Sequence, residues 1–125
     1  AIVALTNGER TRAGVSTLRI SEALRQAAQL QADQIAASGR LEHTLPDARY
    51  PRLEDRLAAA GYAWQPAGEN LAFGQSTAAA VLDAWMQSES HRANILNATF
   101  SEIGTARAVA TGGRMYYVQV FARPR

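Results

Sequence analysis

The chain has 125 residues, and its composition excludes several classes of protein. Apolar residues make up 47% and charged residues 19%, which is typical of a folded domain and excludes a disordered segment. Surface scaling at this length predicts that about two thirds of the unfolded chain's surface becomes buried, so we expect a single domain over residues 1–125. The absence of cysteine excludes disulfides, thiolate metal sites and a cysteine nucleophile.

The charge of the chain is small and spread along its length. Thirteen basic residues, all arginine, oppose 11 acidic residues and leave a formal net charge of +2. Nucleic-acid surfaces concentrate basic residues among aromatic ones, whereas the densest run here, Arg49–Arg56, contains two acids; we therefore expect no nucleic-acid partner. No apolar run approaches the roughly 18 residues that span a bilayer. Ala1–Leu5 is too short for a signal-peptide core, so if the protein is exported, we expect its signal to have been removed already.

The first half of the chain is predicted to be mainly helical. A helix is expected over Ile2–Arg12, followed by a short extended stretch at residues 18–20. Ser21 is a suitable N-cap for a long helix that ends at Gly39 and carries a stripe of small apolar residues. After a polar segment that contains two prolines, a short helix is predicted over Leu53–Ala60.

The second half begins with a short segment, Gly68–Gly74, which is either a strand or a tight loop. Thr77 can cap a helix that runs through Met86, and Trp85 lies on the predicted buried face of that helix. The pattern then falters, and Ser90 is a candidate cap for a second helical piece that ends at Leu96.

The C-terminal segment carries the clearest strand pattern. Glu102–Ala110 and Arg114–Ala122 flank Thr111–Gly113, which indicates a hairpin. Alternation in the last strand predicts that one face carries Met115, Tyr117, Gln119 and Phe121, and the other carries Tyr116, Val118 and Val120. Helices followed by strands predict an α+β fold.

Histidine is the residue type most suited to carry chemistry here, and the chain has two, His43 and His91. Neutral imidazoles bind zinc, and Glu69 is a candidate third ligand, but the spacing equally suits two surface or hydrogen-bonded histidines. Ser88 lies three residues before His91, which permits a serine–histidine nucleophile pair. In the simpler alternative, Ser88 and Ser90 hydrogen-bond to the backbone between two helices.

Several segments of the chain, taken together, form one pattern of motifs: Asn7-x-x-Arg10, Leu18-x-x-Ser21, His43, Gly68-Glu69-Asn70-Leu71-Ala72, Trp85-Met86-x-Ser88-x-x-His91-Arg92-x-Asn94-Ile95-Leu96, Glu102-Ile103-Gly104 and Tyr117-Val118-Gln119-Val120-Phe121. In their order and spacing these motifs resemble one family, the CAP superfamily of cysteine-rich secretory, antigen 5 and pathogenesis-related proteins, which is also called the SCP domain. The resemblance covers nearly the whole chain, and the form without cysteine is similar to bacterial members.

This resemblance implies a three-layer α-β-α sandwich with a small antiparallel sheet and a cleft that displays two histidines and two glutamates able to bind a divalent metal. His43 and Glu69 match the first member of each pair. Ser88 and Tyr116 stand where the family has its second glutamate and second histidine, and His91 is a candidate replacement. The cleft residues expected on this basis are His43, Glu69, Asn70, Ser88, His91 and Tyr116.

Three functions are compatible with these residues. The first is a non-enzymatic binding module in the extracellular space or cell envelope, monomeric, with an unidentified ligand or envelope component as its partner. The second is a metal-assisted hydrolase in which His43 and His91 hold zinc and Glu69 acts as general base. The third is a lipid carrier, as some relatives of the family are, which requires an apolar groove.

Overall fold

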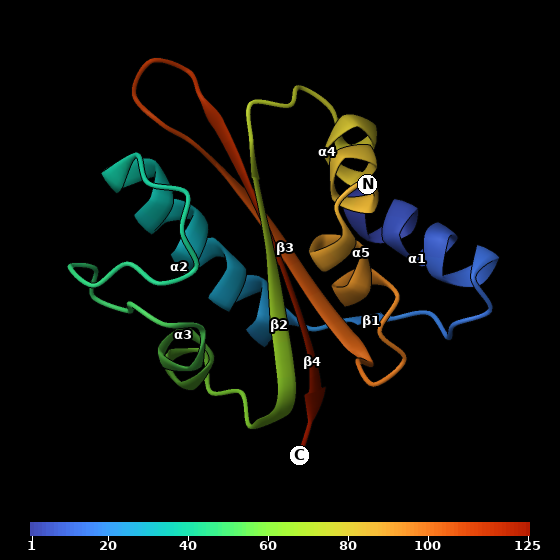
Figure 1. The fold of residues 1–125 in the computed structure, drawn as a ribbon. Helices are drawn as coiled ribbons and strands as arrows, with labels where there is room; N and C mark the ends of the chain where they lie inside the picture. Colours follow the sequence, from blue (N-terminus) through green and yellow to red (C-terminus); the bar gives the residue numbers. More distant parts are fainter.

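The computed structural model describes residues 1–125, apart from the side chain of Gln65. The described residues form five helices and a four-stranded sheet (Figure 1). Helices α2 and α3 lie on one side of the sheet and α1, α4 and α5 lie on the other, which confirms the three-layer arrangement. The elements are α1 Ile2–Arg12, β1 Arg19–Ile20, α2 Glu22–Ser38, α3 Leu53–Ala59, β2 Trp64–Phe73, α4 Ala78–Met86, α5 Glu89–Ile95, β3 Glu102–Val109 and β4 Met115–Pro124.

The sheet has the strand order β1-β3-β4-β2, so β1 and β2 are its outer strands. The pairs β2–β4 and β3–β4 are antiparallel as predicted, whereas β1 runs parallel to β3. The expected all-antiparallel sheet is therefore a mixed one. A parallel pair needs a long crossover, and the chain between β1 and β3 supplies one, but a two-residue strand carries no pattern from which its direction follows.

The predicted hairpin at the C-terminus is confirmed. β3 and β4 pair from Glu102 opposite Ala122 to Val109 opposite Met115. Gly112 and Gly113 have φ angles of 96° and 90°, which glycine adopts readily and other residues avoid. The segment Gly68–Gly74, for which a strand and a loop were both open, lies mostly within strand β2.

Two of the three predicted helix caps are confirmed and one is wrong. The Oγ of Ser21 accepts a hydrogen bond from the Leu24 amide at 3.2 Å, and Thr77 caps α4 in the same way. Ser90 does not cap the last helix, because α5 begins at Glu89 with Ser88 at its N-cap position. The alternative in which Ser88 caps the backbone is also wrong: its side chain makes no cap hydrogen bond and contacts His91 instead.

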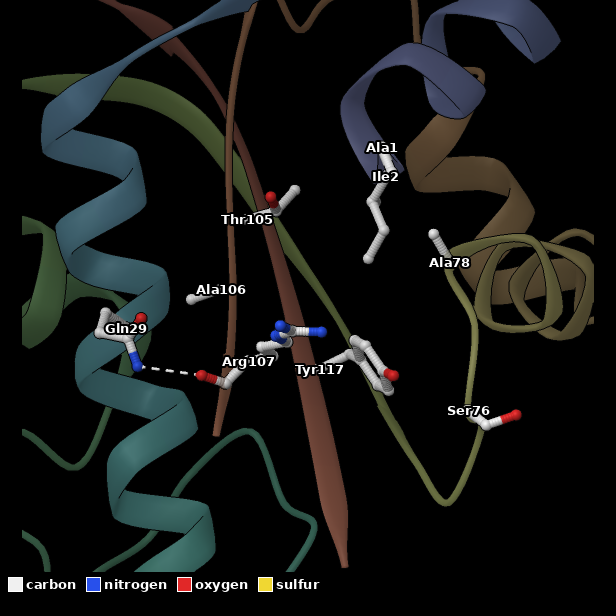
Figure 2. A pocket seen from close by; sticks show the side chains of 9 residues that line it. All are labelled: Ala1, Ile2, Gln29, Ser76, Ala78, Thr105, Ala106, Arg107 and Tyr117. Atoms are coloured by element: carbon white, nitrogen blue, oxygen red, sulfur yellow. Dashed lines mark hydrogen bonds between the residues drawn. The ribbon is translucent and has the colours of Figure 1, made fainter. Parts of the chain in front are cut away.

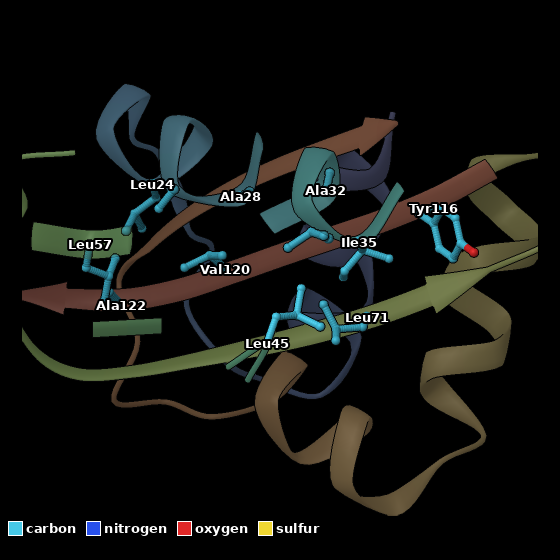
Figure 3. Close-up of a cluster of buried hydrophobic side chains, with 12 residues drawn as sticks. Leu24, Ala28, Ala32, Ile35, Leu45, Leu57, Leu71, Tyr116, Val120 and Ala122 are labelled. Carbon is cyan, nitrogen blue, oxygen red and sulfur yellow. The ribbon is translucent and has the colours of Figure 1, made fainter. Parts of the chain in front are cut away.

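The core lies on both faces of the sheet, in two clusters that follow the predicted alternation of β4. Tyr116, Val118 and Val120 pack with α2 on one face (Figure 3), and Tyr117 and Phe121 pack with α1, α4 and α5 on the other. Trp85 is 2% exposed, as its predicted position requires. Its indole Nε1 donates to the carbonyl of Leu71 at 2.9 Å, so α4 is joined to the outer edge of β2.

Helix α1 is attached to the rest of the fold through the buried side chain of Arg10. This guanidinium donates to four backbone carbonyls, one at the last residue of α5 and two in the segment that follows it: Ser16 at 2.7 Å, Ile95 at 2.8 Å, Asn97 at 3.0 Å and Phe100 at 3.3 Å. One turn earlier, the Asn7 side chain pairs with both the amide and the carbonyl of Leu18. Asn7 and Arg10, the two polar residues of the first motif, therefore hold distant segments together through side-chain hydrogen bonds.

Candidate functional site

The outer strand β2 carries two neighbouring polar residues, Glu69 and Asn70, at its centre. Because successive side chains of a strand point to opposite faces, Glu69 faces α3 and Asn70 faces α5. His43 reaches Glu69 from the segment between α2 and α3, and His91 belongs to α5. The edge of β2 therefore lies between two layers that each contribute one histidine.

Glu69 is half of a buried ion pair. One guanidinium nitrogen of Arg56, Nη2, lies 3.1 Å from each of its two carboxylate oxygens, and the two side chains are 2% and 0% exposed. His43 Nδ1 lies 3.1 Å from the Oε1 oxygen, while the His43 side chain itself is 58% exposed. A buried carboxylate needs a counter-charge and hydrogen bonds. Arg56 supplies both and leaves the imidazole at the surface.

Arg56 also fixes the segment that carries His43. Its guanidinium donates to the backbone carbonyls of His43 at 3.2 Å, Tyr50 at 3.1 Å and Pro51 at 3.1 Å. The sequence alone predicts no role for Arg56, because the arginines are considered there only as a possible nucleic-acid surface. The available signal was its position in the short predicted helix, three residues after Leu53 and next to Leu57, on the side that faces the core.

Asn70 ties α5 to the sheet on the opposite face. Its amide nitrogen donates to the His91 carbonyl and to Gln119 Oε1, both at 3.1 Å. Its oxygen accepts from Asn94 Nδ2 at 2.9 Å, and Gln119 continues the network to Thr6. Asn70 is fully buried, and its amide fixes the position of α5. Asn94, present in the motif but not among the predicted site residues, completes this network.

His91 and Ser88 form a side-chain pair at the start of α5. His91 Nδ1 lies 2.8 Å from Ser88 Oγ. Burial lowers the pKa of His91, and the electrostatic influence of the His43 imidazole lowers it further. The lowered pKa favours the neutral form of the His91 ring at pH 7.

Tyr116 is a core residue. Its side chain is 2% exposed and belongs to the core cluster that packs on α2, beside Phe73 at a ring-centre distance of 6.3 Å. The face of β4 on which Tyr116 stands is covered by α2, so this side chain contributes to the core. It also borders a separate pocket between the end of α2 and the β3–β4 turn.

The described side chains do not fit the zinc site that the sequence suggests. Among them, no group of three or more histidine, aspartate or glutamate side chains is arranged to hold a metal ion. Arg56 gives a physical reason, because its guanidinium already neutralises the Glu69 carboxylate and would stand beside the added cation. No step of a reaction is therefore derived through a metal.

The chain belongs to the CAP family. The sequence model of this family, described as the cysteine-rich secretory protein family, matches residues 3–121. YkwD of Bacillus subtilis strain 168, an uncharacterized protein, is 39% identical over 103 residues, or 82% of this chain and 39% of that protein. The uncharacterized membrane protein YlbC of the same strain is 28% identical over 98% of this chain and 33% of its own length. The chain thus spans less than two fifths of each relative.

Two of the solved structures that match this fold are bacterial. An extracellular SCP-domain protein of Bacillus anthracis is 30% identical, with a TM-score of 0.87 over 98% of this chain and 39% of that one. An outer surface protein of Borrelia burgdorferi is 22% identical and shares the fold, with a TM-score of 0.89 over 99% of this chain and 90% of that one. Within the described residues, no helix combines the length and apolar character needed to cross a membrane.

Proposed function

We propose that this CAP domain is a non-enzymatic binding module of the cell envelope or extracellular space, whose ligand contacts His43, Ser88 and His91. The observation that carries the proposal is the buried Arg56–Glu69 ion pair beneath the half-exposed His43 ring. A charged pair inside a small domain is weak evidence for stability, because desolvation offsets most of its attraction. It is well suited to hold a surface side chain in one orientation, which reduces the entropy lost on binding.

The chemistry of the residues favours binding over catalysis. The Glu69 carboxylate is paired with Arg56 and 2% exposed, so it is poorly placed to take a proton from a water in solvent. The Ser88–His91 pair resembles a nucleophile and its base. However, no Gly-x-Ser-x-Gly sequence surrounds Ser88, which stands at the N-cap position of α5 and not on the strand-to-helix turn of a nucleophile elbow.

The cell envelope as the location is supported by the relatives. The two bacterial structures are described as an extracellular protein and an outer surface protein. An envelope ligand rich in hydroxyl and amide groups is matched by two imidazoles and a hydroxyl, which donate and accept hydrogen bonds without adding net charge. We therefore take a peptidoglycan component as the partner to test first.

The proposal is tested by co-sedimentation with purified peptidoglycan sacculi at pH 7.5. We expect the wild type to sediment with the sacculi and the His43→Ala/His91→Ala variant to lose about tenfold or more in affinity. Arg123→Ala, at an exposed position outside the site, is the matched control and should bind as the wild type does. Soluble fragments released from the sacculi report on hydrolysis in the same samples.

Equal sedimentation of the wild type and the double variant, or none by either, would overturn the proposed site. Fragments released by the wild type but not by the double variant would establish a hydrolase instead. Zinc is tested separately by calorimetry: we expect no binding heat that distinguishes the wild type from the double variant. A heat that disappears with the two histidines would replace the metal-free binding module by a metal-dependent one.

A further inference from the structure

A groove of about 570 Å³ lies along β3, between α2 and the layer of α1 and α4 (Figure 2). Its floor is formed by Thr105 and Arg107 of β3 and by Tyr117 of β4. Ile2 of α1 and Ala78 of α4 form one side, and Gln29 of α2 stands at the other. The groove thus combines an exposed part of a sheet edge with a shallow, partly apolar channel.

The edge of β3 is free along this groove. β1 pairs only with Glu102 and Ile103, and the chain then leaves the sheet at Ser21, whose amide donates to the Ile103 carbonyl. Backbone groups on a strand point alternately to its two sides, so those of Thr105 and Arg107 point outward like those of Ile103. Thr105 and Arg107 each direct a backbone amide and a carbonyl outward. Among the described residues, the Arg107 carbonyl is the one of these groups that has a partner, because Gln29 Nε2 donates to it at 3.2 Å.

The spacing and charge of these groups define what can fill the groove. Thr105 and Arg107 are two residues apart, so an extended backbone can hydrogen-bond to both, with every second side chain of the added strand facing the channel. Arg107 is exposed and is the one charged side chain among the described residues that line the groove. A partner with an acidic side chain at the facing position complements it.

We infer that the β3 edge is a second binding site, which takes an extended acidic peptide segment of a partner protein as an added strand. The peptide backbone bonds to Thr105 and Arg107, displaces the exposed Gln29 amide from the Arg107 carbonyl, and places a carboxylate beside the Arg107 guanidinium. This site is independent of the histidine site, because the two lie at opposite edges of the sheet.

A second copy of this chain is the less suitable occupant. Two β3 edges joined about a two-fold axis at the groove would bring the two Arg107 guanidinium groups together, and like charges at an edge oppose such pairing. The acidic peptide turns the same arginine into an attractive contact. Charge therefore separates the two possibilities.

The inference is tested by selecting binders from a library of random seven-residue peptides. We expect enriched peptides to carry an aspartate or glutamate among β-branched residues, and to bind about tenfold more weakly to Arg107→Glu. Thr105→Pro should weaken binding similarly, because it removes one outward amide at a place where edge strands tolerate proline. Arg123→Glu makes the same charge change outside the groove and should leave peptide affinity unchanged.

Two results would overturn the inference. One is a selection that enriches no peptide above background, and the other is enriched peptides that bind the Arg107→Glu and Arg123→Glu variants equally well. Concentration-dependent dimers that disappear in Thr105→Pro would assign the edge to self-association instead. The histidine double variant should keep full peptide affinity, so failure here is distinguishable from failure of the proposed envelope-binding function.

Discussion

The two edges of the sheet, at β2 and at β3, differ in the side chains that donate to their outward backbone carbonyls. At the β2 edge, outward carbonyls are capped by side chains from the neighbouring helices: Trp85 donates to Leu71, and Asn94 donates to Glu69 at 3.3 Å. At the β3 edge beyond Ile103, the corresponding side-chain cap is Gln29, from the solvent-exposed side of α2. An edge strand left unpaired is a template for another strand, and proteins usually blunt or cover it.

The difference indicates which edge has been closed for stability and which remains available. The Trp85 cap of β2 is buried and the Asn94 cap is partly buried, so loss of the Trp85 cap leaves a polar group without a partner inside the molecule. The cap of β3 is at the surface, where water can replace it at little cost. A ligand at the β2 edge must therefore bind to side chains beside that edge, whereas a ligand at the β3 edge can hydrogen-bond to the backbone of the strand.

The largest expected effect comes from opening the β2 edge at Trp85. Trp85→Ala should lower the free energy of unfolding by about 3–5 kcal/mol, because it leaves a cavity and frees the Leu71 carbonyl. Urea denaturation at pH 7.5 measures this. Gln29→Ala is the matching change at the β3 edge and should stay within about 0.5 kcal/mol of the wild type. Similar losses in the two variants would contradict the contrast between the edges.

The ion pair behind the β2 edge is the next test. Arg56→Leu should destabilise the domain by about 3–5 kcal/mol, since it leaves the Glu69 carboxylate buried without its counter-charge. Removing both charges in Arg56→Leu/Glu69→Leu should recover most of that loss. Thermal melts of the two variants decide the point. If the double variant is as unstable as the single one, the arginine acts mainly through the carbonyls of the His43 segment.

Two glycines compare backbone packing at the same two edges. A Cβ at Gly104 on β3 would lie 2.1 Å from the Arg25 amide nitrogen and 2.2 Å from the Leu24 carbonyl carbon, both backbone atoms. Gly104→Ala should therefore cost about 3 kcal/mol. At Gly68 on β2 the nearest atoms, at 3.0 Å, belong to the Asn94 and Phe100 side chains, which can move. Gly68→Ala should cost about 1 kcal/mol, and equal denaturation midpoints would contradict this ranking.

The smallest effect concerns the proton on His91. Burial and the charge of His43 lower the pKa of His91 in the folded state below its ordinary value of 6.5, so the unfolded chain binds this proton more tightly. Its contribution to stability is therefore present above pH 6.5 and is lost as the pH falls through the folded pKa. The free energy of unfolding should fall more between pH 7.5 and pH 5 for the wild type than for His91→Gln. Urea titrations at both pH values measure the difference.

Much of the fold could be predicted because it depends on local signals. Caps at Ser21 and Thr77, the glycines of the last turn and the alternation in β4 each act within a few residues. The direction of β1 and the cap of α5 could not be predicted. A two-residue strand has no periodicity, and the Ser88 hydroxyl is drawn to His91, which competes with the backbone amides.

The candidate site was only partly accessible from the sequence. His43 and Glu69 stand 26 positions apart, and the family resemblance brought them together before the structure did. The role of Arg56 could not be predicted, because its partners are a carboxylate on another element and three backbone carbonyls. Every residue has a backbone carbonyl, so such partners leave no motif in the sequence. Tyr116 was placed by position within a motif, although the strand's alternation assigned its side chain to the core beneath α2.

The buried Arg10 has a consequence for the order in which the domain forms. Three of its four carbonyl partners lie 85 to 90 residues further along the chain. During synthesis α1 emerges before the other elements of this domain, yet this guanidinium has no folded surroundings until residue 100 has left the ribosome. Contacts over such separations slow folding, because a long loop must close before they form. We expect α1 to remain solvated and open to proteases until most of the domain has been synthesised.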